Sequence, residues 1–382
     1  LNPQQAGCNY PFKTLCGCGV AFKFLQAVCI TQEWAAGEYL SYLDLVATAT
    51  ACDIVPLLDE NRVLVYFGLK RLEENARVGF RALIQISERS LPLRVSDLVF
   101  GLGPMINAAG RLGDAKESVR LLICTDVQEA QTQARHLQVQ NENRKALDQQ
   151  ILNEAIGLLE KKALGNSIVL FDTRWHKGIV GIVASRLVER YHKPTIVLAE
   201  SAGQAVGSAR SVPGVDISSL IGKCDSLLTN YGGHKHAAGL TLPIENVPAL
   251  QKKIEALLSE ETIGDVIIYI AAHITLAEIS FELYEKIQSF APFGPSNRTP
   301  VFATEKVLLY GTPRLLKRSH LQFEIISTTG KRYRCIAFSQ AHHLSILQED
   351  SPFDICYTLM ENNWNGIRSL QLNIKDIRRS EE

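Results

Sequence analysis

The feature that most constrains the fold is a stretch from Asp126 to Leu164 that contains no proline and only Gly157 as a helix breaker. It is rich in Gln, Glu, Lys, Arg and Ala, and a capping box, Thr125-x-x-Gln128, marks its start. At a rise of about 1.5 Å per residue, this pattern predicts one continuous helix of about 50 to 60 Å that can join two domains across a cleft. The apolar positions form two narrow stripes separated by a polar middle, which favours a helix anchored at both ends over a coiled coil: Ala130, Ala134 and Leu137, then Leu147, Ile151, Ala155 and Leu158.

The composition describes a globular chain without a global charge signal. Of its 382 residues 46% are hydrophobic and 21% charged, which suits two or three domains with substantial cores. Forty basic residues balance forty acidic ones, so any nucleic-acid site must be a local patch. The nine cysteines are odd in number, Cys16-Gly-Cys18 lacks the spacing of a zinc hairpin, and no run is apolar enough for a signal peptide or a membrane span. We therefore expect a cytoplasmic protein with no membrane partner.

The region after the long helix alternates strand and helix signals, which predicts an α/β domain. Short β-branched runs indicate strands, and amphipathic stretches between them indicate helices. The expected elements are strands over 167–172, 195–198 and 206–211, and helices over 179–191 and 215–228. In such a domain, ligands collect at the ends of the strands.

The stretch Tyr231–Gly239 carries the chemistry of a phosphate cradle in that domain. Gly232 and Gly233 let backbone N–H groups approach an anion, while His234, Lys235 and His236 add donors and charge. The alternative is a glycine turn entering a strand, with histidines on the surface. Because Ser208 and Arg210 come at the end of a neighbouring predicted strand, we favour an anion site formed by these side chains together: Ser208, Arg210, Gly232, Gly233, His234 and His236.

Before the long helix, two short stretches carry polar groups in apolar surroundings. Asp53 lies near the end of an almost wholly apolar or small segment, 42–56, that Pro56 terminates. An unpaired carboxylate is costly in a core, so Asp53 is either a metal ligand at the mouth of a site or a cap of the next turn. In 100–114 a loop rich in small residues offers Asn107 and Arg111, which can hold a phosphodiester or form part of a structural turn.

The C-terminal region predicts a small β-barrel of the OB type. About five short strands, near 307–310, 321–326, 333–338, 353–359 and 370–374, follow a first run at 266–270, with turn signals such as Asn365-Gly366 between them. Between Glu305 and Arg334 basic residues outnumber acidic ones, with Tyr310, His320, Phe323 and Tyr333 interleaved. This pattern fits either a solvated basic face or single-strand binding, for which the candidates are Lys317, Arg318, Lys331, Arg332 and Arg334.

Five segments, in this order, resemble the bacterial RecJ family, the single-strand-specific 5′ to 3′ DNA exonucleases of the DHH phosphoesterase superfamily. They are Asp44-Leu-Val-Ala…Asp53-Ile-Val-Pro-Leu57, Gly103-Pro-x-Ile-Asn-Ala-Ala-Gly-Arg111, Gly207-Ser-Ala-Arg210, Gly232-Gly-His-x-x-Ala-Ala-Gly239 and Phe293-Gly-Pro-x-Asn-x-x-Pro-Val-Phe302. The fourth alone would indicate only a DHHA1 domain, which phosphodiesterases of short RNA and cyclic dinucleotides also carry. The second segment and the C-terminal region favour RecJ.

The resemblance implies an architecture and roles for the candidate residues. The chain would comprise the C-terminal part of a DHH domain (1–125), a long connecting helix (126–165), a DHHA1 domain (166–262) and an OB-like nucleic-acid-binding domain (263–382). Two Mn²⁺ or Mg²⁺ ions would drive the hydrolysis that releases 5′-mononucleotides, with Asp53 as a metal ligand. Asn107 and Arg111 would lie near the scissile phosphate, and Ser208, Arg210 and His234 would hold the nucleotide and its 5′-phosphate. The implied partners are single-stranded DNA and other proteins of DNA repair and recombination, and the expected oligomeric state is a monomer.

Two departures from the family pattern shape what we expect of this polypeptide. The Asp-x-Asp and Asp-His-His motifs that supply most metal ligands are absent, and the chain opens on Leu1-Asn2-Pro3 with Met105 and Met360 as its methionines. We therefore expect a fragment that is inactive alone although its parent is an exonuclease; a phosphodiesterase of short substrates and a non-catalytic single-strand-binding module are the alternatives. In addition, Met105 stands where we expect a basic residue in many relatives.

Overall fold

The structure is a computed structural model, and it describes residues 1–161, 164–259, 264, 267–327, 329–349, 351–364 and 366–381. The chain divides into two compact units, and each unit is made of segments that are not contiguous in the sequence. Unit 1 comprises Leu1–Glu74, Pro92–Ser96 and Ile267–Glu382, and unit 2 comprises Asn75–Leu91 and Asp97–Val266. Among the described residues, no helix is both long enough and apolar enough to cross a membrane.

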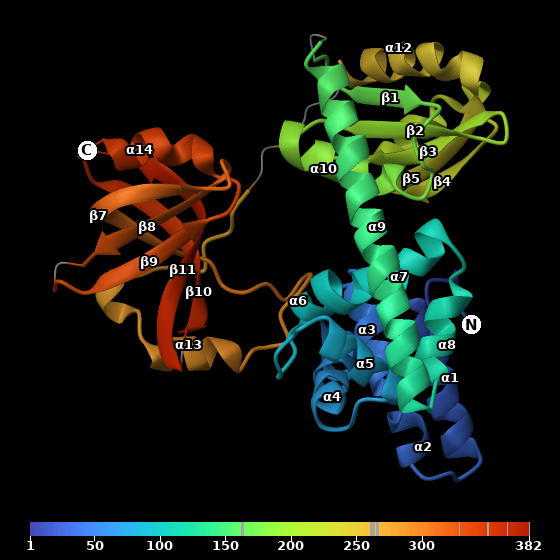
Figure 1. The fold of residues 1–382 in the computed structure, drawn as a ribbon, viewed down its shortest axis with the longest axis horizontal. Coiled ribbons are helices and arrows are strands. Elements are labelled where there is room, and N and C mark those ends of the chain that lie inside the picture. Colours follow the sequence, from blue (N-terminus) through green and yellow to red (C-terminus); the bar gives the residue numbers. More distant parts are fainter. Residues whose placement is uncertain are drawn as a thin grey trace. The chain divides into compact units, whose positions relative to one another are not determined.

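The first part of unit 1 is helical. Figure 1 draws its first four helices in shades of blue, α1 (Gly17–Thr31), α2 (Gly37–Leu40), α3 (Leu43–Cys52) and α4 (Asp59–Asn75), and the short α6 (Val95–Asp97) in teal. Gly68 permits the close packing of α4 on α3, because a Cβ there would meet the Leu43 carbonyl oxygen at 2.3 Å. The apolar segment predicted over 42–56 is thus a buried helix, and Asp53 is the residue that caps its C-terminus.

The second part of unit 1 is a closed five-stranded barrel. Its strands run β7–β8–β9–β11–β10, and β10 pairs again with β7, while β9 and β11 are parallel. This connectivity is that of an OB fold, as the sequence predicted. The elements are β6 (Ala272–His273), 3₁₀ turns Leu276–Glu278 and Ala341–His343, α13 (Phe281–Gln288), β7 (Phe302–Leu316), β8 (His320–Ile326), β9 (Arg332–Ala337), α14 (Leu344–Gln348), β10 (Phe353–Trp364) and β11 (Ile367–Arg379).

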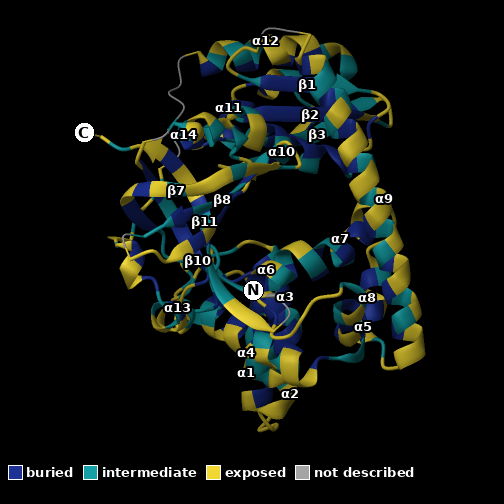
Figure 2. Ribbon diagram, turned by 60° about the vertical axis from the view of Figure 1, so that its left-hand side comes forward, coloured by how far each residue is buried: buried dark blue, intermediate teal, exposed yellow. Residues whose placement is uncertain are grey.

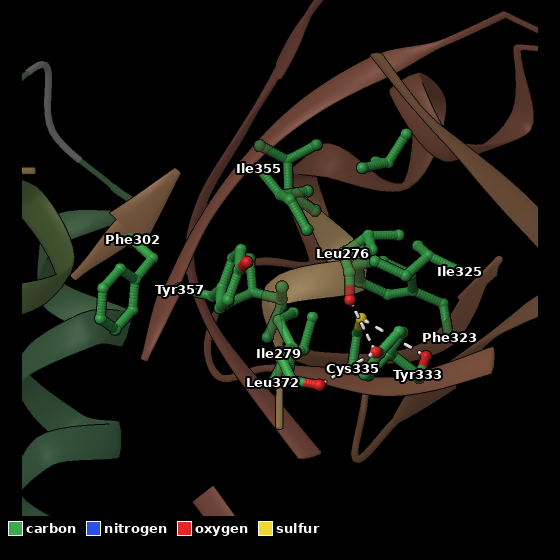
Figure 3. Close-up of a cluster of buried hydrophobic side chains, with 14 of the residues drawn as sticks. Leu276, Ile279, Phe302, Phe323, Ile325, Tyr333, Cys335, Ile355, Tyr357 and Leu372 are labelled. Atoms are coloured by element: carbon green, nitrogen blue, oxygen red, sulfur yellow. Dashed lines mark hydrogen bonds between the residues drawn. The ribbon is translucent and has the colours of Figure 1, made fainter. Parts of the chain in front are cut away.

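Strand alternation fills the barrel with large side chains, which Figure 3 shows in close-up. Tyr333 reaches across it and donates a hydrogen bond from its hydroxyl to the Leu276 carbonyl at 2.7 Å. Two expectations for this region are wrong. Ile267–Ile270 is irregular, the first strand being β6, and Phe323 and Tyr333 are core residues at 2% exposure because they point inward from β8 and β9. Val266 and Asn365, parts of the predicted first strand and last turn, lie outside the described residues.

Unit 2 is built on a five-stranded sheet of order β1–β2–β3–β5–β4, with β1 and β2 parallel and the other pairs antiparallel. Two hydrophobic clusters cover its faces, one with α9 and α10 and the other with α11 and α12. The elements are β1 (Ile168–Asp172), α10 (Val180–Tyr191), β2 (Thr195–Ser201), β3 (Gln204–Arg210), α11 (Ile217–Gly222), a 3₁₀ turn Asp225–Leu227, β4 (Asn230–His234), β5 (Ala237–Pro243), a 3₁₀ turn Ile244–Asn246 and α12 (Val247–Leu258). The helix expected over 215–228 is therefore shorter than predicted.

Unit 2 also contains a helical end, formed by α5 (Val78–Ile86), a π-helical turn Leu98–Leu102, α7 (Gly103–Leu112) and α8 (Lys116–Ile123). The glycine-rich segment 100–114 is thus largely helical, and its prediction as a loop is wrong. Pro104 lies in the first turn of α7, where a missing N–H costs nothing, and Ala108 and Ala109 favour helix. Met105 is buried in this packing at 4% exposure, which explains an apolar residue there.

The long helix α9 (Val127–Leu159) joins the two parts of unit 2, and Figures 1 and 2 show its length. Its 33 residues correspond to about 50 Å, as predicted. Its polar middle is not wholly solvated, however. Asn141 and Asp148 are buried and continue the apolar stripe between Leu137 and Ile151.

The N-terminus of α9 supplies a first testable prediction. Asp126, rather than Thr125, caps the helix by accepting a hydrogen bond from the Glu129 N–H at 2.7 Å. Asp126→Ala is expected to lower the free energy of unfolding by about 1 kcal/mol, measured by urea denaturation, because a helix N–H loses its acceptor. Thr125→Ala is the matched control and should change it by less than about 0.5 kcal/mol; the reverse order would reassign the cap.

Candidate functional site

Three neighbouring strands of unit 2 bring the predicted anion ligands to one end of the sheet. Arg210 at the end of β3 and His234 at the end of β4 are both in register with Ala237 at the start of β5. Residues directly opposite in antiparallel strands project from the same face, so the two cationic or titratable side chains flank Ala237 on one face. Ser208 lies two residues before Arg210 and shares that face.

Glycines line the sheet between these side chains. Gly232 and Gly239 oppose one another in the same row as Ser208. A Cβ built at Gly232 would meet nothing within 4 Å, and one at Gly239 would meet only the Gly207 carbonyl oxygen, at 3.9 Å. The surface between Ser208, Arg210 and His234 is therefore open. We call this surface, which Gly232 and Gly239 line, the glycine floor.

At position 233, glycine is required for a different structural reason. A Cβ there would lie 2.4 Å from the Ala237 carbonyl oxygen and 2.5 Å from Ala238 Cα, so the β4–β5 hairpin closes only without a side chain. The hairpin end is held in place from both sides. The Ser211 N–H donates to the His236 carbonyl and the Ile217 N–H to the Lys235 carbonyl, both at 3.1 Å. His234 and His236 are thus exposed on an anchored turn.

Arg210 is fixed before any ligand arrives. Its Nε donates to Ser185 Oγ at 3.2 Å, and its Nη1 donates to the Ala209 carbonyl at 2.8 Å and to Ser208 Oγ. Burial lowers the pKa of this guanidinium, and the charge of Arg111 lowers it further. A half-buried cation without a carboxylate among these hydrogen-bond partners is suited to bind an anion.

Arg111 reaches the same region from α7. Its Nη1 donates to the Gly178 carbonyl at 3.2 Å, and its own carbonyl would lie 2.2 Å from a Cβ at Gly178. Asn107 precedes Arg111 by one helical turn and is exposed with it. The structure thus brings Arg111, Ser208, Arg210 and the glycine floor into one unit.

Sequence reasoning missed a group of charges on the facing helices. Asp148 on α9 is fully buried, and its Oδ2 lies 3.0 Å from Nη2 of Arg186 on α10. Arg144 lies one turn before Asp148, and burial lowers its pKa. Arg144 and Asp148 are four residues apart in the polar middle of α9, the spacing that could have suggested an ion pair, but nothing in the sequence indicated that this middle is buried.

Asp53 belongs to unit 1. It is exposed at the C-terminal end of α3, and partial desolvation raises the pKa of its carboxyl. A carboxylate is a suitable ligand for Mn²⁺ or Mg²⁺, yet among the described residues no three His, Cys, Asp or Glu side chains come together as a metal site would require.

The barrel of unit 1 presents basic side chains together with exposed aromatic rings, among them Tyr310. The Arg332 guanidinium lies over the ring of Tyr310, 3.8 Å from its centroid, and Arg334 pairs with Glu324 at 3.3 Å. Lys331 instead donates to the Ile279 carbonyl at 3.1 Å and lies over Tyr333. Lys317 and Arg318 form the β7–β8 turn with positive φ angles of 47° and 60°. Lys331, Arg332 and Arg334 are exposed on or next to β9, and Lys331 and Arg334 also have partners in the barrel.

Comparison with known proteins gives a consistent assignment along the chain. Residues 145–260 match the family model of the DHHA1 domain, and residues 270–376 match that of the RecJ OB domain. The single-stranded-DNA-specific exonuclease RecJ of Escherichia coli is 33% identical over 99% of this chain and 69% of its own length. The chain belongs to the RecJ family.

Two further RecJ proteins agree with this membership. RecJ of Bacillus subtilis is 33% identical over all of this chain and 49% of its own length. The crystal structure of RecJ from Thermus thermophilus in complex with Mg²⁺ superposes with a TM-score of 0.86 over 98% of this chain and 57% of that one, at 28% identity. The chain therefore spans between about half and two thirds of the length of the RecJ proteins that it matches.

Proposed function

We propose that this chain is the strand-holding part of a metal-dependent, single-stranded-DNA-specific 5′ to 3′ exonuclease. The observation that carries the proposal is the glycine floor, where Ser208, Arg210 and His234 surround an open surface. The names of its RecJ relatives support single-stranded DNA as the substrate. We assign this floor to the 5′-terminal phosphate of the strand.

Each side chain of the floor has a defined task in this proposal. Arg210, held by Ser185 and Ser208, would neutralise the terminal phosphate, and the Ser208 hydroxyl would donate to one of its oxygens. His234 and His236 would contribute further donors from the anchored hairpin. Gly232 would let the phosphate approach the backbone, Gly233 would keep the hairpin closed, and Asn107 and Arg111 would contact the phosphodiester that follows.

The hydrolysis itself would be carried out by Mn²⁺ or Mg²⁺ in the whole enzyme. RecJ from Thermus thermophilus has been crystallised with each of these ions, which supports divalent metal use by the family. This chain would contribute Asp53 as one ligand. Because the described residues bring no three metal-binding side chains together, we propose that residues 1–382 alone bind strands without cleaving them.

Four regions with separate roles make up the proposed organisation. Residues 1–125 would belong to the catalytic domain, 126–165 to the connecting helix, 166–262 to the phosphate-holding domain and 263–382 to the barrel that binds the strand. We propose that the chain acts as a monomer in the cytoplasm, with other proteins of DNA repair as partners.

The basic surface of the barrel gives the second prediction. Arg332→Ala is expected to weaken binding of a 20-nucleotide thymidine strand about two- to fivefold, because Arg332 and Tyr310 would both contact the strand. The slope of affinity against salt concentration should fall by about one phosphate contact. Fluorescence anisotropy over a range of NaCl concentrations measures both. Lys286→Ala on α13, whose ammonium pairs with Glu282, is the matched control and should leave the slope unchanged. An unchanged slope for Arg332→Ala would remove this arginine from the interface.

The proposed function is tested by comparing binding with cleavage. Without divalent metal, residues 1–382 should bind single-stranded DNA in a salt-dependent way and more tightly than blunt duplex. With Mn²⁺ they should release no mononucleotides. Equal binding of single strand and duplex would contradict the proposed substrate. Nuclease activity that Asp53→Ala abolishes would contradict the proposal that residues 1–382 alone bind strands without cleaving them.

A further inference from the structure

The buried polar stripe of α9 places a carboxylate beside the arginines of unit 2. Asp148 has no exposed surface, and its contact with Arg186 is an ion pair of 3.0 Å between Oδ2 and Nη2. In the described part of the chain neither of its oxygens accepts a hydrogen bond of good geometry. The carboxylate therefore interacts mainly through its charge.

Residues of α10 link Asp148 to Arg210 at the edge of the glycine floor. Arg186 follows Ser185 on α10, and Ser185 accepts the hydrogen bond that orients Arg210. Gly181, one turn before Ser185, leaves room for Arg210 and Ser208, whose Nη2 and Oγ would lie 3.2 and 3.3 Å from a Cβ there. Desolvation raises the pKa of the Asp148 carboxyl against the opposing charges of Arg186, Arg144 and Arg111, and burial lowers the pKa of Arg210, with the charge of Arg111 lowering it further.

We propose that Asp148 is an internal counter-charge that competes with the terminal phosphate of the strand for the surrounding arginines and thereby limits how tightly the floor holds it. The inference rests on the proposed function. Arg111, Arg144 and Arg186 act on Asp148 through their charges and Arg111 acts likewise on Arg210, so among these five residues four positive charges face one carboxylate. Asp148 reduces this excess while the floor is empty and continues to attract the same arginines when a phosphate is present.

The anchoring of Arg210 determines the direction of the effect. Its hydrogen bonds go to Ser185, Ser208 and Ala209, and Arg111 donates to Gly178, so neither depends on Asp148 for its orientation. Removing the carboxylate should leave the phosphate ligands in place and increase the positive potential around them. A mononucleotide product carries the same 5′-phosphate as the strand, so a limit on affinity would also speed product release.

The test compares a thymidine tetranucleotide carrying a 5′-phosphate with the same molecule ending in a 5′-hydroxyl, by calorimetry in EDTA at low salt. The ratio of the two dissociation constants, hydroxyl over phosphate, isolates the floor from the rest of the interface. In Asp148→Asn, which keeps the shape of the side chain, the ratio should rise about three- to tenfold over wild type. The melting temperature without ligand should fall, because the arginines repel one another.

Matched variants separate charge from structure. Glu142→Gln removes an exposed carboxylate from the same helix and should leave the ratio unchanged. Arg186→Gln should lower the ratio, and Asp148→Asn combined with Arg186→Gln should restore it to within about twofold of wild type, since the cluster again carries the original net charge. The comparison of Arg186→Gln with the double variant tests the proposal even if Asp148→Asn alone does not fold.

The outcomes are distinguishable. A wild-type protein without preference for the 5′-phosphate would contradict the proposed function itself. A wild-type preference that Asp148→Asn leaves unchanged or lowers would overturn only the role of Asp148 and leave it as a structural ion pair. A double variant as low as Arg186→Gln would overturn it equally, because it would make Arg186 a direct phosphate ligand.

Discussion

Arg210→Ala is expected to weaken binding of a 5′-phosphorylated thymidine tetranucleotide by about 100-fold. The guanidinium is half-buried, is held by three hydrogen bonds and projects beside the open glycine floor. Losing a preorganised, charge-assisted contact to a phosphate costs about 2 to 4 kcal/mol, which corresponds to a factor of about 30 to 1,000 in affinity. Calorimetry in EDTA measures the loss without interference from hydrolysis.

The 5′-hydroxyl form of the same tetranucleotide distinguishes a specific contact from a general loss of charge. Arg210→Ala should weaken its binding by about threefold at most, because the terminal phosphate is missing. Arg120→Ala, which removes an exposed arginine from α8 of the same unit, should affect both molecules little. A loss of similar size for the phosphate and hydroxyl forms would show that Arg210 supports the fold or the strand, not its terminal phosphate.

Phe353→Ala is expected to destabilise the barrel by about 3 to 5 kcal/mol. Phe353 is 1% exposed in the hydrophobic cluster of the barrel, and its ring packs edge-on against Phe323 at 6.3 Å between centroids. Removing a buried aromatic ring loses its transfer free energy and leaves a cavity. Urea denaturation followed by circular dichroism should show the barrel unfolding at a lower concentration than in the wild type.

An exposed phenylalanine from the same barrel is the control for this variant. Phe338 is 53% exposed, and Phe338→Ala should change the free energy of unfolding by less than about 1 kcal/mol. If the barrel is an independent module, Phe353→Ala should leave the 5′-phosphate preference of unit 2 in place. Loss of that preference together with barrel stability would contradict the assignment of the phosphate site to unit 2 alone.

The repeating patterns of the sequence were enough to predict the elements of the fold. A helix period without proline predicted α9, and short β-branched runs predicted the two sheets, because these patterns follow directly from backbone geometry. Small residues misled the prediction at 100–114. Glycine and proline punctuate loops, but Pro104 lies where a helix tolerates it, so most of the segment became α7.

The site was predicted in part, for a physical reason. Ser208, Arg210 and His234 come at the ends of strands, and strand order alone brings such residues together. Asp148, Arg144 and Arg186 come from the middle of two helices, where a polar residue suggests solvent. Only the packing of α9 on α10 shows that Asp148 is buried among arginines. In the barrel, the alternation of β8 and β9 points Phe323 and Tyr333 inward, where the basic pattern around them had suggested contacts with bases.

The central claim is that the glycine floor binds the 5′-terminal phosphate of a single strand, and one ratio tests it most directly. It is the dissociation constant of the wild-type chain for the 5′-hydroxyl thymidine tetranucleotide divided by that for the 5′-phosphorylated form, measured by calorimetry in EDTA. We predict a ratio of at least about 10, since the terminal phosphate adds a charge-assisted contact with Arg210. A ratio near one would contradict the claim.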